Sequence, residues 1–367
     1  MSTVQNIYRI ILPGIILQSV LVGGGFATGR EIVEYGAKFG SYGWVSGVFI
    51  FLGFTLMSIL TFEACRIWQT FDYKSLLKKL TGKGWMLYEA IYIPLALLTI
   101  AVMASAAGEI LHETLNIQVW VGVGVIILLV GILNFQSDDV IAWMKTIGTL
   151  LLITAYTYFG VTVWFDRSEQ VSEVFLTNSH PEGLSLITVA WTGILYVGYN
   201  LGIYPASFFV VRGLATKRDS ILAGVFSGVL MSIPWFLTYI AILGYYPDPD
   251  VLNAPVPWLR MLTPYSIFYV GVFGVVVGWT LVETATGVIH AFLGRLANDF
   301  EERNKKLKRI HRLFIAFGAL FIAMAMSKIG IINLIAKGYL AMAYGMILVF
   351  AVPLLYNIRK ILFPKPR

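Results

Sequence analysis

Ten apolar segments occupy most of this chain, and they constrain its fold more than any other feature of the sequence. A bilayer crossing needs about 20 mostly apolar residues in a helix. Of all residues, 58% are hydrophobic and 13% are charged, whereas an average soluble domain carries about 25% charged residues. We therefore predict an all-α polytopic membrane protein with ten transmembrane helices, at residues 8–36, 43–66, 85–111, 119–135, 143–165, 185–212, 220–244, 264–294, 310–327 and 330–357.

The distribution of Lys and Arg predicts how these spans are oriented. Ten spans place both termini on one side, and 21 of the 27 Lys and Arg residues then fall on that side. Basic residues accumulate in cytoplasmic loops, so we expect cytoplasmic N- and C-termini in a multi-pass cell-membrane protein. The net charge of +7 thus indicates orientation and not nucleic-acid binding. Four basic residues fall on the outer side: Lys38, Arg167, Arg260 and Lys328.

Two polar stretches, residues 166–184 and 245–263, are predicted as the main outer loops. Four prolines make the second loop irregular, which favours a short helix lying over an outer vestibule. The single cysteine, Cys65, excludes an internal disulfide, and the four histidines are dispersed. We therefore expect no resident cofactor. The predicted spans form a single transmembrane domain over residues 1–367.

The ten spans divide into two halves of five, at about residues 8–165 and 185–357. An odd number of spans per half inverts the second half relative to the first. Short echoes fall at equivalent places, since Val22-Gly23 in the first span matches Val197-Gly198 in the sixth. Similar echoes link spans two and seven and spans three and eight, so we predict a 5+5 inverted repeat.

Both the first and the sixth span contain residues that interrupt helices. Gly23-Gly24-Gly25 costs about 1 kcal/mol per glycine relative to alanine, and Pro205 follows a glycine-rich run in the sixth span. Paired interruptions at equivalent positions are the best sequence indication of a transporter site, because unwound backbone in a membrane must line a cavity or be buried. The alternative is that these glycines only allow close helix packing.

The glycine-rich motif of the first span also resembles a known family. Residues 23–31, Gly-Gly-Gly-Phe-Ala-Thr-Gly-Arg-Glu, with Glu34 following, resemble the YkvI family of bacterial membrane proteins. The span count and the paired breaks resemble the LeuT-type fold of the amino acid–polyamine–organocation transporter superfamily. The resemblance implies a LeuT-like architecture in a bacterial cell (inner) membrane, with helices 1 and 6 broken near the midplane, and it does not define a substrate.

The two breaks are predicted to build a substrate site. A short half-helix beginning near Ala27 would direct free N–H groups at a carboxylate or other anion, while carbonyl groups at the break suit a cation. This chemistry predicts a zwitterionic or anionic organic solute, amino-acid-like, although an aromatic residue in a span also serves simple packing. The expected substrate-binding residues are Gly23, Gly24, Gly25, Phe26, Ala27, Trp191, Tyr196, Tyr199 and Asn200.

A polar face of the eighth span is the predicted coupling site. Thr280, Glu283 and Thr284 share one helical face. The LeuT-like resemblance implies that hydroxyl groups there join first-span carbonyls, such as that of Gly23, at a Na⁺ site. Glu283 departs from that pattern, and it would either ligate Na⁺ or carry H⁺. The hydroxyl groups alternatively bond the i−4 carbonyl. Lys145 in the fifth span is a weaker candidate. The resemblance implies it, because some proton-coupled relatives use a fifth-span lysine in place of Na⁺.

Charges inside the spans form a predicted gate or charge network. Arg30 and Glu34 are four residues apart and can pair along one helical face, with Glu31 between them. Lys337 lies within the last span, either as a counter-charge for Glu31 or Glu283 or as a side chain extending to the interface. Charges in spans usually face partners or water.

These patterns favour a secondary active transporter that works by alternating access and couples its solute to Na⁺ or H⁺. The alternative is a solute-sensing membrane receptor subunit on the same scaffold, similar to germinant-receptor subunits, without concentrative transport. An enzyme is not expected, because no acid, histidine or metal cluster gathers at one interface. The expected partners are a small-molecule substrate and membrane lipid, and the sequence leaves the oligomeric state open between monomer and homo-oligomer.

Overall fold

The computed structural model describes residues 3–133, 138–302 and 309–363, and its regular structure over these residues is entirely helical. Three apolar helices of 10–17 residues occur at Ile7–Leu21, Val119–Leu133 and Phe314–Ser327. Six helical stretches are long and apolar enough to cross a membrane: Ala37–Trp68, Tyr73–Leu115, Leu186–Val211, Lys217–Leu243, Ile267–Ile289 and Ile331–Tyr356.

The first predicted span is interrupted twice. It consists of α1 (Thr3–Leu21), α2 (Gly24–Ala27) and α3 (Arg30–Tyr35). Gly23 is extended between the first two pieces, with φ −97° and ψ −167°. Gly29 separates α2 from α3 in the left-handed region, with φ 85°. A side chain at Gly29 would be strained there, and its Cβ would also contact the ring of Trp258.

The sixth predicted span is interrupted as well. Helix α9 (Leu186–Asn200) begins where the Ser185 side chain accepts a hydrogen bond from the Ile187 N–H, which is a helix N-cap. The chain then tightens into the 3₁₀ turn η3 (Leu201–Ser207) and continues as α10 (Phe208–Val211). Pro205 lies inside η3, where it lacks the N–H that would continue the α-helical pattern. The structure therefore contains both of the predicted helix interruptions.

The remaining elements follow the predicted segments with extensions at several ends. They are η1 (Ala37–Tyr42), α4 (Gly43–Trp68), α5 (Tyr73–Thr81), η2 (Gly82–Gly84), α6 (Trp85–Leu115), α7 (Val119–Leu133), α8 (Asp138–Leu176), α11 (Lys217–Leu243), α12 (Pro249–Leu252), α13 (Pro257–Leu262), α14 (Ile267–Glu302), α15 (Arg309–Ser327), α16 (Ile331–Asn333), η4 (Leu334–Tyr339), α17 (Leu340–Met346), η5 (Ile347–Ala351), α18 (Val352–Tyr356) and α19 (Ile358–Leu362).

One predicted loop is wrong in its first part. Residues 166–176 continue α8 to Leu176 after a bend at Arg167. Val171 and Val174 are buried on one face of this extension, so its polar sequence forms an amphipathic helix. The loop at 245–263 agrees with the prediction of an irregular path, because it contains the short helices α12 and α13.

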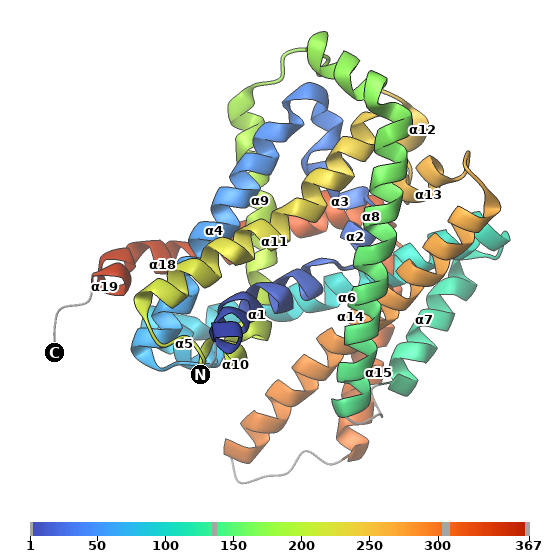
Figure 1. The fold of residues 1–367 in the computed structure, drawn as a ribbon. Helices are drawn as coiled ribbons and strands as arrows, with labels where there is room; N and C mark the ends of the chain where they lie inside the picture. The colour runs from blue at the N-terminus through green and yellow to red at the C-terminus, as the bar shows by residue number, and fades with distance from the viewer. Residues whose placement is uncertain (1–2, 134–137, 303–308, 364–367) are drawn as a thin grey trace.

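The helices pack as two groups, and the pieces of the broken helices contact both of them. In the first group α4 packs on α9 and α11, and α1 packs on α11 and η3. In the second group α6 contacts α7, α14 and α15, and α14 also contacts α8. Helix α2 touches both α6 and α14. In Figure 1, α5 and α10 lie near the N-terminus, whereas α12 and α13 lie at the opposite end of the molecule.

Candidate functional site

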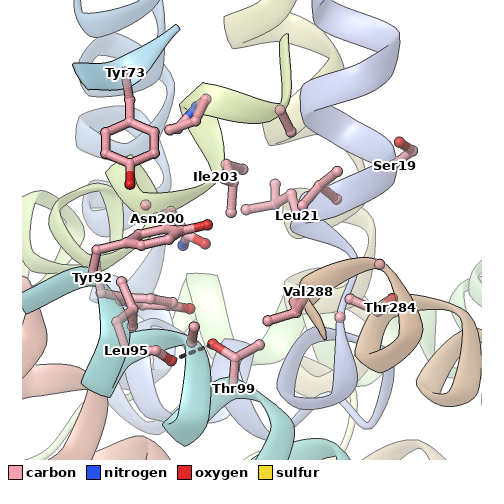
Figure 2. A pocket seen from close by; sticks show the side chains of 18 of the residues that line it. Ser19, Leu21, Tyr73, Tyr92, Leu95, Thr99, Asn200, Ile203, Thr284 and Val288 are labelled. Carbon is pink, nitrogen blue, oxygen red and sulfur yellow. Dashed lines mark hydrogen bonds between the residues drawn. The ribbon is translucent and has the colours of Figure 1, made fainter. Parts of the chain in front are cut away.

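A cavity of about 980 Å³ lies between the two groups of helices, at the upper end of the range for small-molecule sites. Its walls come from α1, α3, α5, α6, α9, η3, α10, α14 and η4, and it reaches both interruptions, at Gly23 and at Gly202. Figure 2 shows Tyr73 and Tyr92 on one side of this space and Thr284 and Val288 on the other.

The cavity opens at the end formed by α5. The lining residues Asp72, Lys78 and Phe209 are exposed, so this end meets solvent or lipid. Asp72 caps α5 by accepting a hydrogen bond from the Ser75 N–H at 2.8 Å. The ammonium group of Lys78 lies 5.6 Å from the centre of the Trp85 ring. The open mouth therefore carries charges of both signs.

A buried carboxylate lines the inner part of the cavity. Glu31 on α3 is 4% exposed, and the Tyr199 hydroxyl donates a 2.6 Å hydrogen bond to its Oε2 atom. The carboxylate also lies against the first break, because a Cβ added to Gly25 would come within 2.8 Å of the Glu31 Cδ atom. Glu31 thus links α3 to α9 across both interrupted helices.

Four tyrosine rings gather around Glu31. Tyr35 and Tyr196 meet edge to face with ring centres 5.3 Å apart, and Tyr196 meets Tyr199 in the same way at 5.4 Å. Tyr199 stacks on Tyr339 of η4, with ring centres 4.4 Å apart and planes inclined by 16°. Tyr199 and Tyr339 line the cavity, whereas Tyr35 and Tyr196 form the layer behind them.

The polar face of α14 reaches the cavity in part. Glu283, Thr284 and Gly287 line it together with Gly23, and a Cβ on Gly23 would lie 3.7 Å from the Thr284 Cγ2 atom. Thr280 does not line the cavity, and its hydroxyl donates to the Val276 carbonyl at 2.9 Å. Thr280 therefore forms the bond to the i−4 carbonyl that was the alternative to an ion site. Thr284 lies beside the first break.

Glu283 lies between the cavity and α8. Its residue exposure is 8%, and its Oε2 atom occupies the position that a Cβ on Gly148 of α8 would need. Gly148 thus makes room for this carboxylate between α14 and α8. The other candidate from this helix, Lys145, is three residues before Gly148, and its side chain lies outside the described residues.

Several predicted substrate contacts lie elsewhere in the structure. Phe26 and Ala27 are fully buried, and Ala27 accepts a hydrogen bond from the Tyr156 hydroxyl, so α2 is enclosed by neighbouring helices and does not line the cavity. Gly24 packs on α6, where an added Cβ would come within 3.0 Å of the Met103 Cα atom. The predicted anion site at the start of this half-helix needs correction, because α2 has only four residues and the Glu31 carboxylate lies against it.

The α9 residues that were predicted to contact substrate do not all line the cavity. Trp191 is 44% exposed, and its Nε1 atom lies 3.4 Å from the Tyr344 hydroxyl. Its side chain therefore points from α9 toward α17 and away from the cavity. Tyr196 is buried behind Tyr199. Asn200 lines the cavity, and its side-chain amide donates to the Tyr196 carbonyl at 2.9 Å.

At the end of the molecule opposite α5, the segment that contains α12 and α13 is bonded to the first broken helix. The Arg30 guanidinium donates to the carbonyl oxygens of Leu252 at 2.6 Å and Ala254 at 3.2 Å. The Trp258 N–H donates to the Thr28 carbonyl at 3.1 Å. The segment between α11 and α14 is therefore fastened to the C-terminal end of α2 and to α3.

The predicted charge network is present around Glu34. Arg30 pairs with Glu34 at 3.5 Å, as its four-residue spacing predicts, and Lys38 pairs with the other Glu34 oxygen. Lys337 is exposed on η4, so it does not act as the counter-charge that was considered for Glu31 or Glu283. Its other predicted role, extension toward the interface, is compatible with this position.

Sequence reasoning missed several rings that line the cavity, among them Tyr92 and Tyr339. Tyr92 on α6 stacks on Tyr88, four residues earlier, with ring centres 5.6 Å apart. An aromatic residue in an apolar span is most often a packing residue, so only the position of the helix around the cavity distinguishes these two.

The helical fold resembles that of solved membrane transporters. It superposes on a Na⁺-coupled sialic acid symporter with a TM-score of 0.55, 13% identity and coverage of 98% of this chain and 85% of that one. It also superposes on the Eremococcus coleocola manganese transporter, with a TM-score of 0.50, 14% identity and coverage of 97% and 80%.

The predicted resemblance to YkvI is also confirmed. The chain is 24% identical over 345 residues to a Bacillus subtilis (strain 168) protein described as uncharacterized membrane protein YkvI, covering 88% of this chain and 90% of that protein. No protein-family model matches the sequence. The chain is thus a distant relative of YkvI with the fold of known membrane transporters.

Proposed function

We propose that this protein is a secondary active transporter that moves a small organic solute by alternating access. The observation that most supports this function is the 980 Å³ cavity, which reaches both interrupted helices and whose exposed lining residues lie at the α5 end. Such a cavity is the expected form of one access state of a transporter with broken helices. The solute is amino-acid-like, zwitterionic or anionic, as the sequence predicts.

The proposed topology has ten spans in a 5+5 inverted repeat, with both termini cytoplasmic. Each of the ten predicted segments overlaps one or more helices over its described residues, which supports this count. The open α5 end carries Lys74 and Lys78, and basic residues favour the cytoplasmic side. In this topology the cavity faces the cytoplasm, and Arg30 with α12 and α13 forms the closed outer gate.

The proposed coupling site lies where α14 meets the first break. Glu283, Thr284 and the backbone of Gly23 line one part of the cavity, and they offer the oxygen ligands that a hard cation such as Na⁺ prefers. If H⁺ is the coupling ion, Glu283 carries it. Thr280 is not part of this site, because it does not line the cavity.

Uptake by the purified protein in proteoliposomes tests this function. Radiolabelled amino acids should accumulate against their gradient when either a Na⁺ or a pH gradient is imposed, and only one of the two should drive uptake. Glu283→Gln should abolish the gradient dependence, whereas Glu182→Gln, at an exposed loop position, should not. Solute binding without any accumulation would reject the transporter and favour the sensor.

A further inference from the structure

We propose that Glu31, Tyr199 and Tyr339 bind an ammonium group of the solute. The substrate is then an organic amine or a zwitterion with a free ammonium group, and a purely anionic solute is excluded. This inference rests on the proposed function only in taking the central cavity as the solute site.

Glu31 is a buried carboxylate whose acceptor positions the protein satisfies only in part. Its carboxylate lines the cavity and is 4% exposed, and a buried carboxylate is costly unless a cation or several donors satisfy it. Tyr199 supplies one donor, out of about four acceptor positions on a carboxylate. A solute cation would satisfy the part of this carboxylate that faces the cavity.

The cationic side chains near the cavity make contacts with groups other than Glu31. Arg30 is adjacent in sequence, but its guanidinium binds the Leu252 and Ala254 carbonyls and Glu34. Lys74 and Lys78 lie at the α5 end, 5.2 and 5.6 Å from the centre of the Trp85 ring. In the described part of the chain, Glu31 forms no ion pair, so no side-chain cation competes with a solute cation for this carboxyl group.

Two tyrosine rings form a wall of the cavity beside the Glu31 carboxylate. Tyr199 and Tyr339 stack with ring centres 4.4 Å apart and both line the cavity with Glu31. Tyrosine rings attract cations through their faces. A carboxylate next to aromatic rings is the combination that recognises an alkylammonium group, and the same surroundings would repel an anion.

A ligand series on the full-length protein in detergent tests the inference. The probes are amino acids, the amines obtained by removing their carboxylate, and their N-acetyl derivatives, which lack the ammonium group. Binding is measured by thermal shift and by titration calorimetry. The amino acids that bind should lose binding on N-acetylation and retain it, within about tenfold, on removal of the carboxylate.

Three variants locate the site. Glu31→Gln should weaken amine binding at least tenfold, and Tyr199→Phe, which keeps the ring and removes the hydrogen bond, should weaken it severalfold. Tyr339→Leu removes a ring and tests the wall if Glu31→Gln does not fold. Glu182→Gln is the matched control and should bind as the wild type does.

The outcomes separate this inference from the proposed function. Equal binding of N-acetyl derivatives, unchanged amine affinity in Glu31→Gln, or no binding by any probe would overturn the ammonium site. Amine binding without uptake would retain the site and reject the transporter. Uptake of an acid without an ammonium group would retain the transporter and reject the site.

Discussion

The guanidinium of Arg30 donates a 2.6 Å hydrogen bond to the carbonyl oxygen of Leu252, although the two residues are 222 positions apart in the sequence. Arg30 is 5% exposed and contacts the Ala254 carbonyl with the same nitrogen. A buried arginine can satisfy several backbone acceptors at once because its donors are fixed in a planar group. This contact fastens α3 to the segment that follows α12.

Replacing Arg30 should therefore loosen α12 and α13. Arg30→Gln removes hydrogen bonds to a charged group, each worth about 1.5–3 kcal/mol. Amide hydrogen exchange of residues 249–262 should become at least tenfold faster, while α7 exchanges as before. Arg260→Gln is the matched control, because Arg260 on α13 is 52% exposed and its 3.4 Å pair with Glu113 is worth little. Unchanged exchange in Arg30→Gln would show that other contacts hold this end closed.

The space beside Gly25 is expected to tolerate no side chain. Gly25→Ala would place a Cβ within 2.8 Å of the Glu31 Cδ atom, and overpacking of this kind costs about 1–3 kcal/mol. The midpoint of thermal unfolding of the purified protein should fall. Gly271→Ala, where no atom lies within 4 Å of the added Cβ, should leave it nearly unchanged. Equal midpoints for the two variants would mean that Glu31 moves away from the break without cost.

Two threonines of α14 should differ in their effect on ion coupling. Thr284 lines the cavity beside Gly23, so Thr284→Val should raise the Na⁺ concentration needed for half-maximal uptake by severalfold if Na⁺ is the coupling ion. Thr280→Val should change it little, because the Thr280 hydroxyl is already bonded to Val276. The Na⁺ dependence of initial uptake rates distinguishes them. The reverse order of effects would move the ion site one turn along α14.

Asp219 should stabilise the open end of the cavity through two separate contacts. It pairs with Arg9 of α1 at 3.0 Å, and it completes a capping box with Thr216 at the start of α11. Asp219→Asn should lower the free energy of unfolding by about 1–2 kcal/mol, combining cap and ion-pair losses. Thr216→Ala removes the cap and keeps the ion pair, so it should cost about 1 kcal/mol. Denaturant titration followed by tryptophan fluorescence measures both, and equal losses would show that the Arg9 pair contributes nothing.

The sequence alone determined the features that depend on near neighbours in the chain. Helix formation follows from hydrogen bonds four residues apart, so the apolar segments and the interruptions around Gly23 and Pro205 could be predicted. The pairing of Arg30 with Glu34 follows from the same spacing. The extension of α8 past Arg167 was missed because its polar residues hid an amphipathic pattern.

Only the tertiary structure decided which side chains meet from distant helices. Tyr339 stacks on Tyr199, Arg30 reaches Leu252, Glu31 lies against Gly25, and Trp191 points outward. In a membrane the hydrophobic effect does not select which face of an apolar helix turns inward, because lipid is as apolar as the side chains, so close packing and polar contacts decide it. Those contacts depend on the rotation of each helix against its neighbours, which an apolar stretch of sequence does not encode locally.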